Sequence, residues 1–307
     1  MCVTSVRQVG SNCGAILSVF PKQVVDRRLS MRSIAVFVAL VAMFSVSAAK
    51  DEFQAGDFVK QHLNSIGTEQ ARATVKNRVA QGTVTFQILN RGPQTWEGPA
   101  TLVSEGDKLA SLMKLPPAAY RTEWFVRDEK RTSVAPVKPG SWTEFGDFIK
   151  THNEILTEGL WGGALSIGWA LAHLDERRAK LEDRGVKKVD GVEFHRIDYI
   201  PKKSSDLEIQ LYFEPDTFRH VMTVYLMTIS AHSARTVNQA GNEKEMHYRL
   251  EERFGDFKSV DNLTLPARWI IRFTYGEVSE GIIDQYDITE KKISYNLTLD
   301  PKNFEIK

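Results

Sequence analysis

One serine of the chain lies close to a hydrolase signature. The stretch ALSIG (164–168) approaches the G-x-S-x-G nucleophile elbow, with Ala164 in place of the first glycine. That elbow needs a strand before the serine and a helix after it, within an α/β sheet. Ser166 instead lies inside a long apolar run, where a serine hydroxyl bonds to its own helix backbone. A serine hydrolase therefore stays a remote alternative, and we assign no catalytic residue.

Metal and paired-carboxylate chemistry also lack the spacing that they need. The seven histidines form no H-E-x-x-H or H-x-H pattern, and the two cysteines, Cys2 and Cys13, lie near the start. Glu193 and Asp198 could act as a carboxylate pair, but nothing in the sequence positions them. The balance of 40 basic against 39 acidic residues argues against nucleic acid as the main partner. We expect no metal, no cofactor and no enzymatic activity.

The apolar run LWGGALSIGWALAHL (160–174) is the best candidate for a binding element. On a helix, Trp161, Leu165 and Trp169 would share one face. A neighbouring face would carry Leu160, Ala164, Ile167, Leu171 and Leu174. A helix that is apolar all round must be covered broadly, and each of its glycines costs about 0.8–1 kcal/mol relative to alanine. Two readings stay open: a lid that shifts to admit a ligand, or a core helix packed closely at its glycines.

A strand predicted near residue 225 is apolar on both faces. One face carries Val221, Thr223, Tyr225, Met227 and Ile229. The other face carries Met222, Val224 and Leu226. A sheet with one face in water would alternate, so this strand needs cover on both sides. A strongly curved sheet supplies it, with a core or cavity on the concave side; an ordinary sandwich strand is the alternative.

The order of elements predicts an α+β fold with one large antiparallel sheet. Helices are expected at 51–65 and 68–79. Strands follow from residue 83, with hairpin turns at 105–107 and 128–130.

A helical region then interrupts the strands. Ser141 and Glu144 form a capping-box signature for a helix that carries Phe148. Gly159 can end it, and residues 175–191 read as a charged connector. Nearly everything after residue 191 is strand-like.

The N-terminus carries an export signal. Basic residues up to Arg32 precede an uncharged apolar run at 34–46 and small residues at 47–49, which is typical of a cleaved signal peptide at 31–49. Because Met31 opens this signal, residues 1–30 look like an overlong, disordered extension. A single domain would then occupy residues 50–307. We expect a periplasmic mature chain that is free of cysteine and stable through its core alone.

Three C-terminal stretches resemble the periplasmic outer-membrane lipoprotein carrier family, the LolA-like proteins with their LolB relatives. LYFEPDTFRHVMTVY (211–225) resembles the family's strand–FDPxTF–strand signature. FGDFKSVDNLTLPARWII (254–271) resembles its next strand pair, and NLTLDPKNFEIK (296–307) its closing motif. The resemblance covers about residues 207–307, and the N-terminal half agrees by its order of elements.

The resemblance implies a curved antiparallel half-barrel, covered on its concave side by helices, with acyl chains in the hollow between them. It implies a monomeric carrier for a lipid-modified protein or other amphiphile, served by an inner-membrane transporter and an outer-membrane acceptor. A non-catalytic sensor module of the same fold is the alternative. The residues assigned to hollow and lid are Leu160, Trp161, Leu165, Ile167, Trp169, Phe148, Tyr225 and Met227. In the family an arginine of an early strand bonds to the lid; Arg91 and Arg121 are nearest by order, and no motif selects either.

Overall fold

The structure is a computed structural model that describes residues 53–129, 131–229, 246–277 and 281–306. The predicted extension (1–30) and signal peptide (31–49) lie outside these residues. Within the described ranges, no helix combines the length and the apolar character that crossing a membrane requires.

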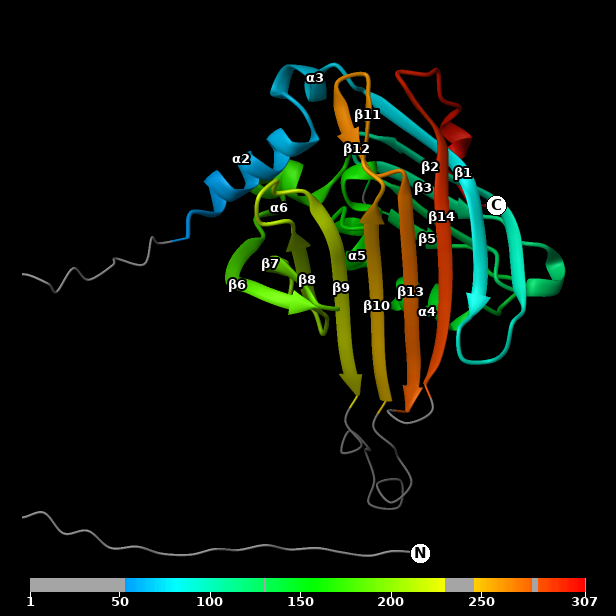
Figure 1. Ribbon diagram of the computed structural model, residues 1–307. Coiled ribbons are helices and arrows are strands. Elements are labelled where there is room, and N and C mark those ends of the chain that lie inside the picture. Colours follow the sequence, from blue (N-terminus) through cyan, green and yellow to red (C-terminus); the bar gives the residue numbers. More distant parts are fainter. Residues whose placement is uncertain (1–52, 130, 230–245, 278–280, 307) are drawn as a thin grey trace, which may run out of the picture. The chain divides into compact units, whose positions relative to one another are not determined.

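Twelve of the described strands form one open antiparallel sheet (Figure 1). In sheet order they are β5 (Arg131–Val134), β4 (Glu123–Asp128), β3 (Lys108–Met113), β2 (Thr95–Glu105), β1 (Asn77–Ile88), β14 (Ile282–Tyr295), β13 (Arg268–Glu277), β10 (Met246–Gly255), β9 (His220–Ile229), β8 (Glu208–Phe213), β7 (Val192–Ile200) and β6 (Lys180–Val189). The first and last strands of this order, β5 and β6, are the two edges, so the sheet does not close. The predicted α+β class with a large antiparallel half-barrel is confirmed.

The segment 144–177, which we call the plug, lies inside the curve of the sheet. It contains α4 (Glu144–Thr151), α5 (Glu154–Thr157), η2 (Gly163–Leu165), η3 (Ala170–His173) and α6 (Leu174–Arg177). Contacts run from α5 to β4 and β5 at one edge, and from η2 to β9 in the other half of the sheet. The sheet therefore bends around the plug, which Figure 1 shows in green between the front and rear strands.

Aromatic side chains fill the space between plug and sheet. Trp161 is fully buried, with its ring centroid 5.3 Å from that of Phe125 and 5.0 Å from that of Trp269. Phe145 of α4 lies 5.4 Å from Phe273 of β13 by the same measure. Burying each such side chain contributes about 1.5–3 kcal/mol. Around Trp161, the concave face of the described sheet is thus occupied by the chain's own side chains.

Two N-terminal helices and a small hairpin pack beside the plug. Helix α2 (Ala55–Ile66) buries Phe58 and His62 and contacts η3 as well as β12 (Leu263–Leu265), which pairs with β11 (Lys258–Val260). This helix corresponds to the one predicted at 51–65. Helix α3 (Glu69–Ala73) is shorter than predicted, because the chain joins β1 and takes its hydrogen bonds from β2 and β14. Two 3₁₀ turns, η1 (Pro117–Ala119) and η5 (Pro301–Phe304), complete the described elements.

The predicted helix at 160–174 is wrong. The run forms two short turns, η2 and η3, with Ser166 extended between them. Gly162 and Gly163 adopt φ values of 75° and 49°, a left-handed conformation that interrupts a right-handed helix and that glycine enters easily. A Cβ on Gly168 would lie 3.0 Å from the Gly106 carbonyl oxygen. Close packing at the glycines is therefore present, although the segment that packs is not a helix.

Two further predictions are corrected. The N-cap of α4 is Thr143 rather than Ser141, because the Thr143 hydroxyl accepts the Gly146 N–H at 2.7 Å. The charged connector at 175–191 contains strand β6, at the edge of the sheet. Charged side chains suit an edge strand because they discourage pairing with another chain.

Strand β9 is buried on both faces, as its sequence indicates. Tyr225 lies in the main core, whereas Met222 and Val224 form a separate cluster with Tyr212 of β8. Phe194 of β7 packs against that second cluster. The curved sheet thus has a small apolar layer on its outer side.

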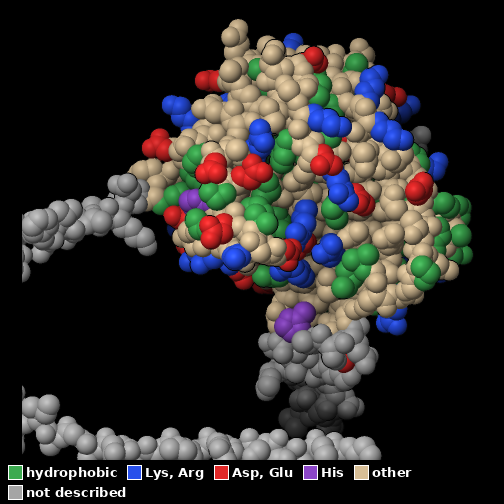
Figure 2. Space-filling view, in the orientation of Figure 1, with side chains coloured by type: hydrophobic (Ala, Val, Ile, Leu, Met, Phe, Trp, Pro, Cys, Tyr) green, Lys and Arg blue, Asp and Glu red, His purple; other side chains and the backbone are tan. Residues whose placement is uncertain are grey.

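Charged pairs cover much of the outer face of the long strands. Glu251 of β10 accepts hydrogen bonds from Arg249 at 2.6 Å and from Arg253. Arg268 of β13 donates to Asp287 of β14 at 2.6 Å. Basic and acidic side chains accordingly alternate over the face in Figure 2.

Candidate binding site

A cavity of about 290 Å³ lies between the N-terminal helices and the plug. Its apolar wall consists of Leu63, Ile66, Ala73, Val75, Ala164, Ile167, Trp169 and Ala172. Five polar residues complete the lining: Glu69, Arg72, Arg78, Ser166 and His173. Ala73 and Ala172 are exposed, so the cavity reaches the surface. A mainly apolar concavity with few polar groups is the usual form of a small-molecule site.

Arg78 of β1 is the buried charge in this wall. Its side chain is 6% exposed, and Nη1 donates to the carbonyl oxygen of Ala164 in the plug at 2.5 Å. The guanidinium carbon lies 5.7 Å from the centre of the Tyr295 ring. Burial lowers the pKa of Arg78 to about 10, so the group remains charged at neutral pH. Nε has no hydrogen-bond partner among the described residues.

Arg78 of β1 and Arg127 of β4 both donate to plug carbonyl oxygens, of Ala164 and Leu156, and the sequence singled out neither. Arg121 instead forms an ion pair with Asp284, 3.3 Å between Nε and Oδ2. Arg91 lines a different cavity, beside Tyr248 and Tyr275.

Two histidines fix Trp169 at the inner wall of the cavity. The Trp169 indole N–H donates to Nε2 of His62 at 2.9 Å, while Nδ1 of His62 lies 2.9 Å from the Phe218 carbonyl oxygen. This arrangement requires a neutral imidazole with its proton on Nδ1, and burial lowers the pKa of His62 to about 4. His220 stacks on the indole, with 4.8 Å between ring centroids.

Two buried carboxyl groups hold the plug from the sheet side. Glu252 of β10 accepts the Gly162 N–H at 2.9 Å and the Tyr225 hydroxyl at 2.9 Å. Glu123 of β4 accepts the Thr143 hydroxyl, which caps α4, at 2.8 Å. Burial raises the pKa of each group to about 8, so both are protonated at neutral pH.

The eight predicted binding residues occupy two kinds of position. Ile167 and Trp169 line the cavity beside Arg78. Five others are buried in the main core: Phe148, Leu160, Trp161, Leu165 and Tyr225. Met227 is partly buried and packs against that core. Contact of any of them with a ligand stays a prediction.

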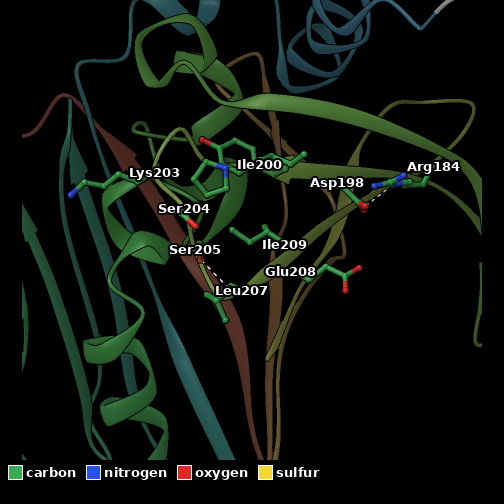
Figure 3. Close-up of a pocket in the computed structure, with 11 residues that line it drawn as sticks. Arg184, Asp198, Ile200, Lys203, Ser204, Ser205, Leu207, Glu208 and Ile209 are labelled. Carbon is green, nitrogen blue, oxygen red and sulfur yellow. Dashed lines mark hydrogen bonds and ion pairs between the residues drawn. The ribbon is translucent and has the colours of Figure 1, made fainter. Parts of the chain in front are cut away.

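A second cavity, of about 330 Å³, opens beside the connection between β7 and β8 (Figure 3). Its apolar lining includes Ile200, Leu207 and Ile209, and Ser204 and Ser205 lie on the connecting loop. Its acidic residue Asp198 is already paired, because it accepts hydrogen bonds from Arg184 at 2.6 Å and from Arg196 at 2.7 Å. Glu193 lies five residues before Asp198 on the same strand and therefore faces the opposite side of the sheet. The glycosidase-like pair considered from the sequence does not form.

Ser166 does not sit on a nucleophile elbow. It follows the 3₁₀ turn η2, and no histidine among the described residues bonds to its hydroxyl. His173, the nearest histidine in sequence, places Nε2 3.3 Å from the Ile167 carbonyl oxygen. In the described part of the chain, no group of three or more His, Cys, Asp or Glu is placed to hold a metal ion.

Protein-family models give no match, and no curated protein matches the sequence. Solved structures do match. A LolA superfamily protein from Nitrosomonas europaea is 11% identical, with a TM-score of 0.46, over 83% of this chain and 99% of that one. An outer membrane lipoprotein-sorting protein domain from Vibrio parahaemolyticus is 12% identical, with a TM-score of 0.44, over 82% and 97%.

A DUF1329 family protein from Desulfovibrio piger is also 12% identical, with a TM-score of 0.43, over 82% of this chain and 97% of that one. These likenesses concern the fold alone. The names of the proteins from Nitrosomonas europaea and Vibrio parahaemolyticus, LolA superfamily protein and outer membrane lipoprotein-sorting protein domain, are those of the family that the C-terminal motifs resemble.

Proposed function

We propose that this chain is an exported, non-catalytic protein that binds an amphiphile by its acyl chain. The observation that carries the proposal is the cavity beside Trp169, because it is mainly apolar and reaches the surface. Burying one methylene group contributes about 0.8 kcal/mol, so a chain of several methylenes binds without any catalytic group. The signal-peptide pattern supports a periplasmic location.

The size of the cavity limits what it holds in this conformation. Its 290 Å³ is near the lower end of the roughly 300–1,000 Å³ found for small-molecule pockets, so it suits a single acyl chain. A lipid-modified protein with several chains would require displacement of the plug. We propose such displacement for transfer from an inner-membrane transporter to an outer-membrane acceptor, and the C-terminal motifs support this role.

A sensor or docking module is the second candidate. The observation that favours it is the aromatic filling around Trp161, which occupies the concave face where a carrier would keep its hollow. In this role the protein would bind a partner protein, and occupancy of the cavity by an acyl chain would be the signal of the state of the envelope.

Cargo binding is testable on the purified mature protein. Native mass spectrometry of protein taken gently from the periplasm should show a bound amphiphile, and an environment-sensitive hydrophobic dye should compete with it. Ala172→Trp places a large ring at the exposed rim of the cavity and should abolish dye uptake. Ala118→Trp is the matched control, since Ala118 is an exposed alanine of another 3₁₀ turn, η1, outside the cavity.

Three results would count against the proposal. Protein without bound amphiphile and without dye uptake would leave the acyl-binding role without support. Equal dye uptake by Ala172→Trp and Ala118→Trp would place binding elsewhere. Labelling by a fluorophosphonate probe that disappears in Ser166→Ala would restore the hydrolase alternative.

A further inference from the structure

We propose that Arg78 binds the oxyanion headgroup, a carboxylate or a phosphate, of a single-chain amphiphile whose tail lies along the apolar wall of the 290 Å³ cavity. This inference rests on the proposed function and adds the headgroup chemistry to it.

The free edge of the guanidinium is the first argument. Nη1 of Arg78 is used by the Ala164 carbonyl oxygen, whereas Nε has no acceptor among the described residues. A carboxylate binds side-on to the edge formed by Nε and Nη2. The protein uses this geometry elsewhere: Arg196 donates from Nε and Nη2 to the two oxygens of Asp198, at 2.7 and 3.1 Å. On Arg78 this edge carries no carboxylate among the described residues, and because Nε is itself buried, a headgroup reaches it through a small shift of the side chain toward the cavity.

The charge balance of the wall is the second argument. Arg78 forms no ion pair with any carboxylate in the described structure, although it is almost completely buried. Arg72 lies in the same wall, where its Nη1 donates to the carbonyl oxygens of Leu63 and Gly67, at 2.5 and 2.6 Å. Against these two guanidinium groups stands one lining carboxylate, Glu69, which is exposed. A buried charge without a counter-ion is costly, so an anionic ligand would relieve that cost.

The apolar wall is the third argument, because it separates an amphiphile from a free anion. Val75, Ile167 and Leu63 line the cavity around the polar end at Arg78. A free phosphate would leave this wall in contact with water, while a neutral lipid would leave Nε of Arg78 without a partner. A molecule with both parts satisfies both.

The test compares headgroups on the same tail. Binding of a long-chain fatty acid, its methyl ester and a monoacyl phosphatidate of equal chain length is measured by calorimetry at neutral pH, with acetate and inorganic phosphate as headgroup-only probes. The acid or the phosphatidate should bind roughly tenfold or more tightly than the ester, as expected for charge-assisted hydrogen bonds. Which of the two binds identifies the source of the oxyanion.

Variants then assign the preference to Arg78. Arg78→Met should reduce binding of the preferred acid to the level at which the same variant binds the ester, while Arg78→Lys should keep part of the preference. Arg272→Met is the control, because Arg272 donates to Gln285 away from the cavity. Thermal melts of each variant check the fold, and if Arg78→Met does not fold, the headgroup comparison on the unaltered protein decides.

Each outcome has a distinct meaning. Equal binding of acid, phosphatidate and ester would overturn the headgroup inference and leave the acyl-binding function standing. A preference that survives Arg78→Met would overturn the role of Arg78. Acetate or phosphate binding as tightly as the long-chain anions would overturn the role of the apolar wall. Binding of none of these compounds would instead contradict the proposed function itself.

Discussion

The free energy of unfolding should decrease as pH rises above about pH 5, and Glu252→Gln should make this decrease smaller. The carboxyl group of Glu252 is fully buried and accepts hydrogen bonds from the Gly162 N–H and the Tyr225 hydroxyl. A glutamine at this position can accept the Gly162 N–H with its carbonyl oxygen and donate from its amide group to the Tyr225 hydroxyl oxygen, but it cannot ionise. The substitution therefore isolates the titration of one group that ties the sheet to the plug.

The magnitude follows from the two pKa values. Burial raises the pKa of Glu252 from 4.5 to about 8, so between these values the unfolded chain releases a proton that the folded chain retains. Stability contributed by this group therefore falls as pH rises through that window, by about 1.4 kcal/mol per pH unit. Between about pH 5 and about pH 7 the loss is on the order of 2–3 kcal/mol.

The assay is urea unfolding of the unaltered protein and Glu252→Gln across that pH range. The difference between their free energies of unfolding should change by roughly 2–3 kcal/mol in favour of the variant, whatever the pH-independent cost of the amide. The titration of Glu123, present in both proteins, cancels from this difference. Glu97→Gln, at an exposed position of β2, controls for the substitution. Parallel stability curves for the two proteins would refute a protonated Glu252.

Two further substitutions test the neighbourhood of the plug. His62→Gln should remove a loss of stability that occurs at acid pH. Burial lowers the pKa of His62 from 6.5 to about 4, so the free energy of unfolding falls by about 1.4 kcal/mol per pH unit as pH falls through this window. Urea midpoints of the two proteins that stay parallel over this range would contradict the prediction. Gly159→Ala should destabilise by at least about 2 kcal/mol more than Gly140→Ala in thermal melts. Both glycines have φ of 73°, but only at Gly159 would the new Cβ meet a carbonyl oxygen, that of Gly168 at 1.9 Å; equal costs would show that the backbone relaxes freely.

The sequence by itself determined the fold class and most of the strands. The apolar residues at 221–229 predicted β9, and their presence on both faces of that strand indicated a curved sheet. The helix predicted at 51–65 and the hairpin turn predicted at 105–107 were also correct. These signals are local, because side-chain periodicity follows directly from backbone geometry.

The predictions that failed depend on non-local contacts. The run 160–174 has helical spacing, but its glycines serve close approaches to Gly106 and to the ring of His220, which are far away in sequence. The charged run that forms β6 is a strand because β7 pairs with it. The intrinsic helix and strand propensities of these residues could not predict either the turns at 160–174 or strand β6, because tertiary contacts outweigh propensity.

The cavity was decided by the tertiary structure alone. Ile167 and Trp169 were predicted as binding residues, but Arg78, His62 and Glu252 gave no signal, because none belongs to a motif. Arg78 and Ala164 are 86 positions apart, and only the bending of the sheet around the plug brings them to 2.5 Å. Periodicity reports which side of an element is apolar, whereas the partner of a buried charge depends on how the whole chain closes around it.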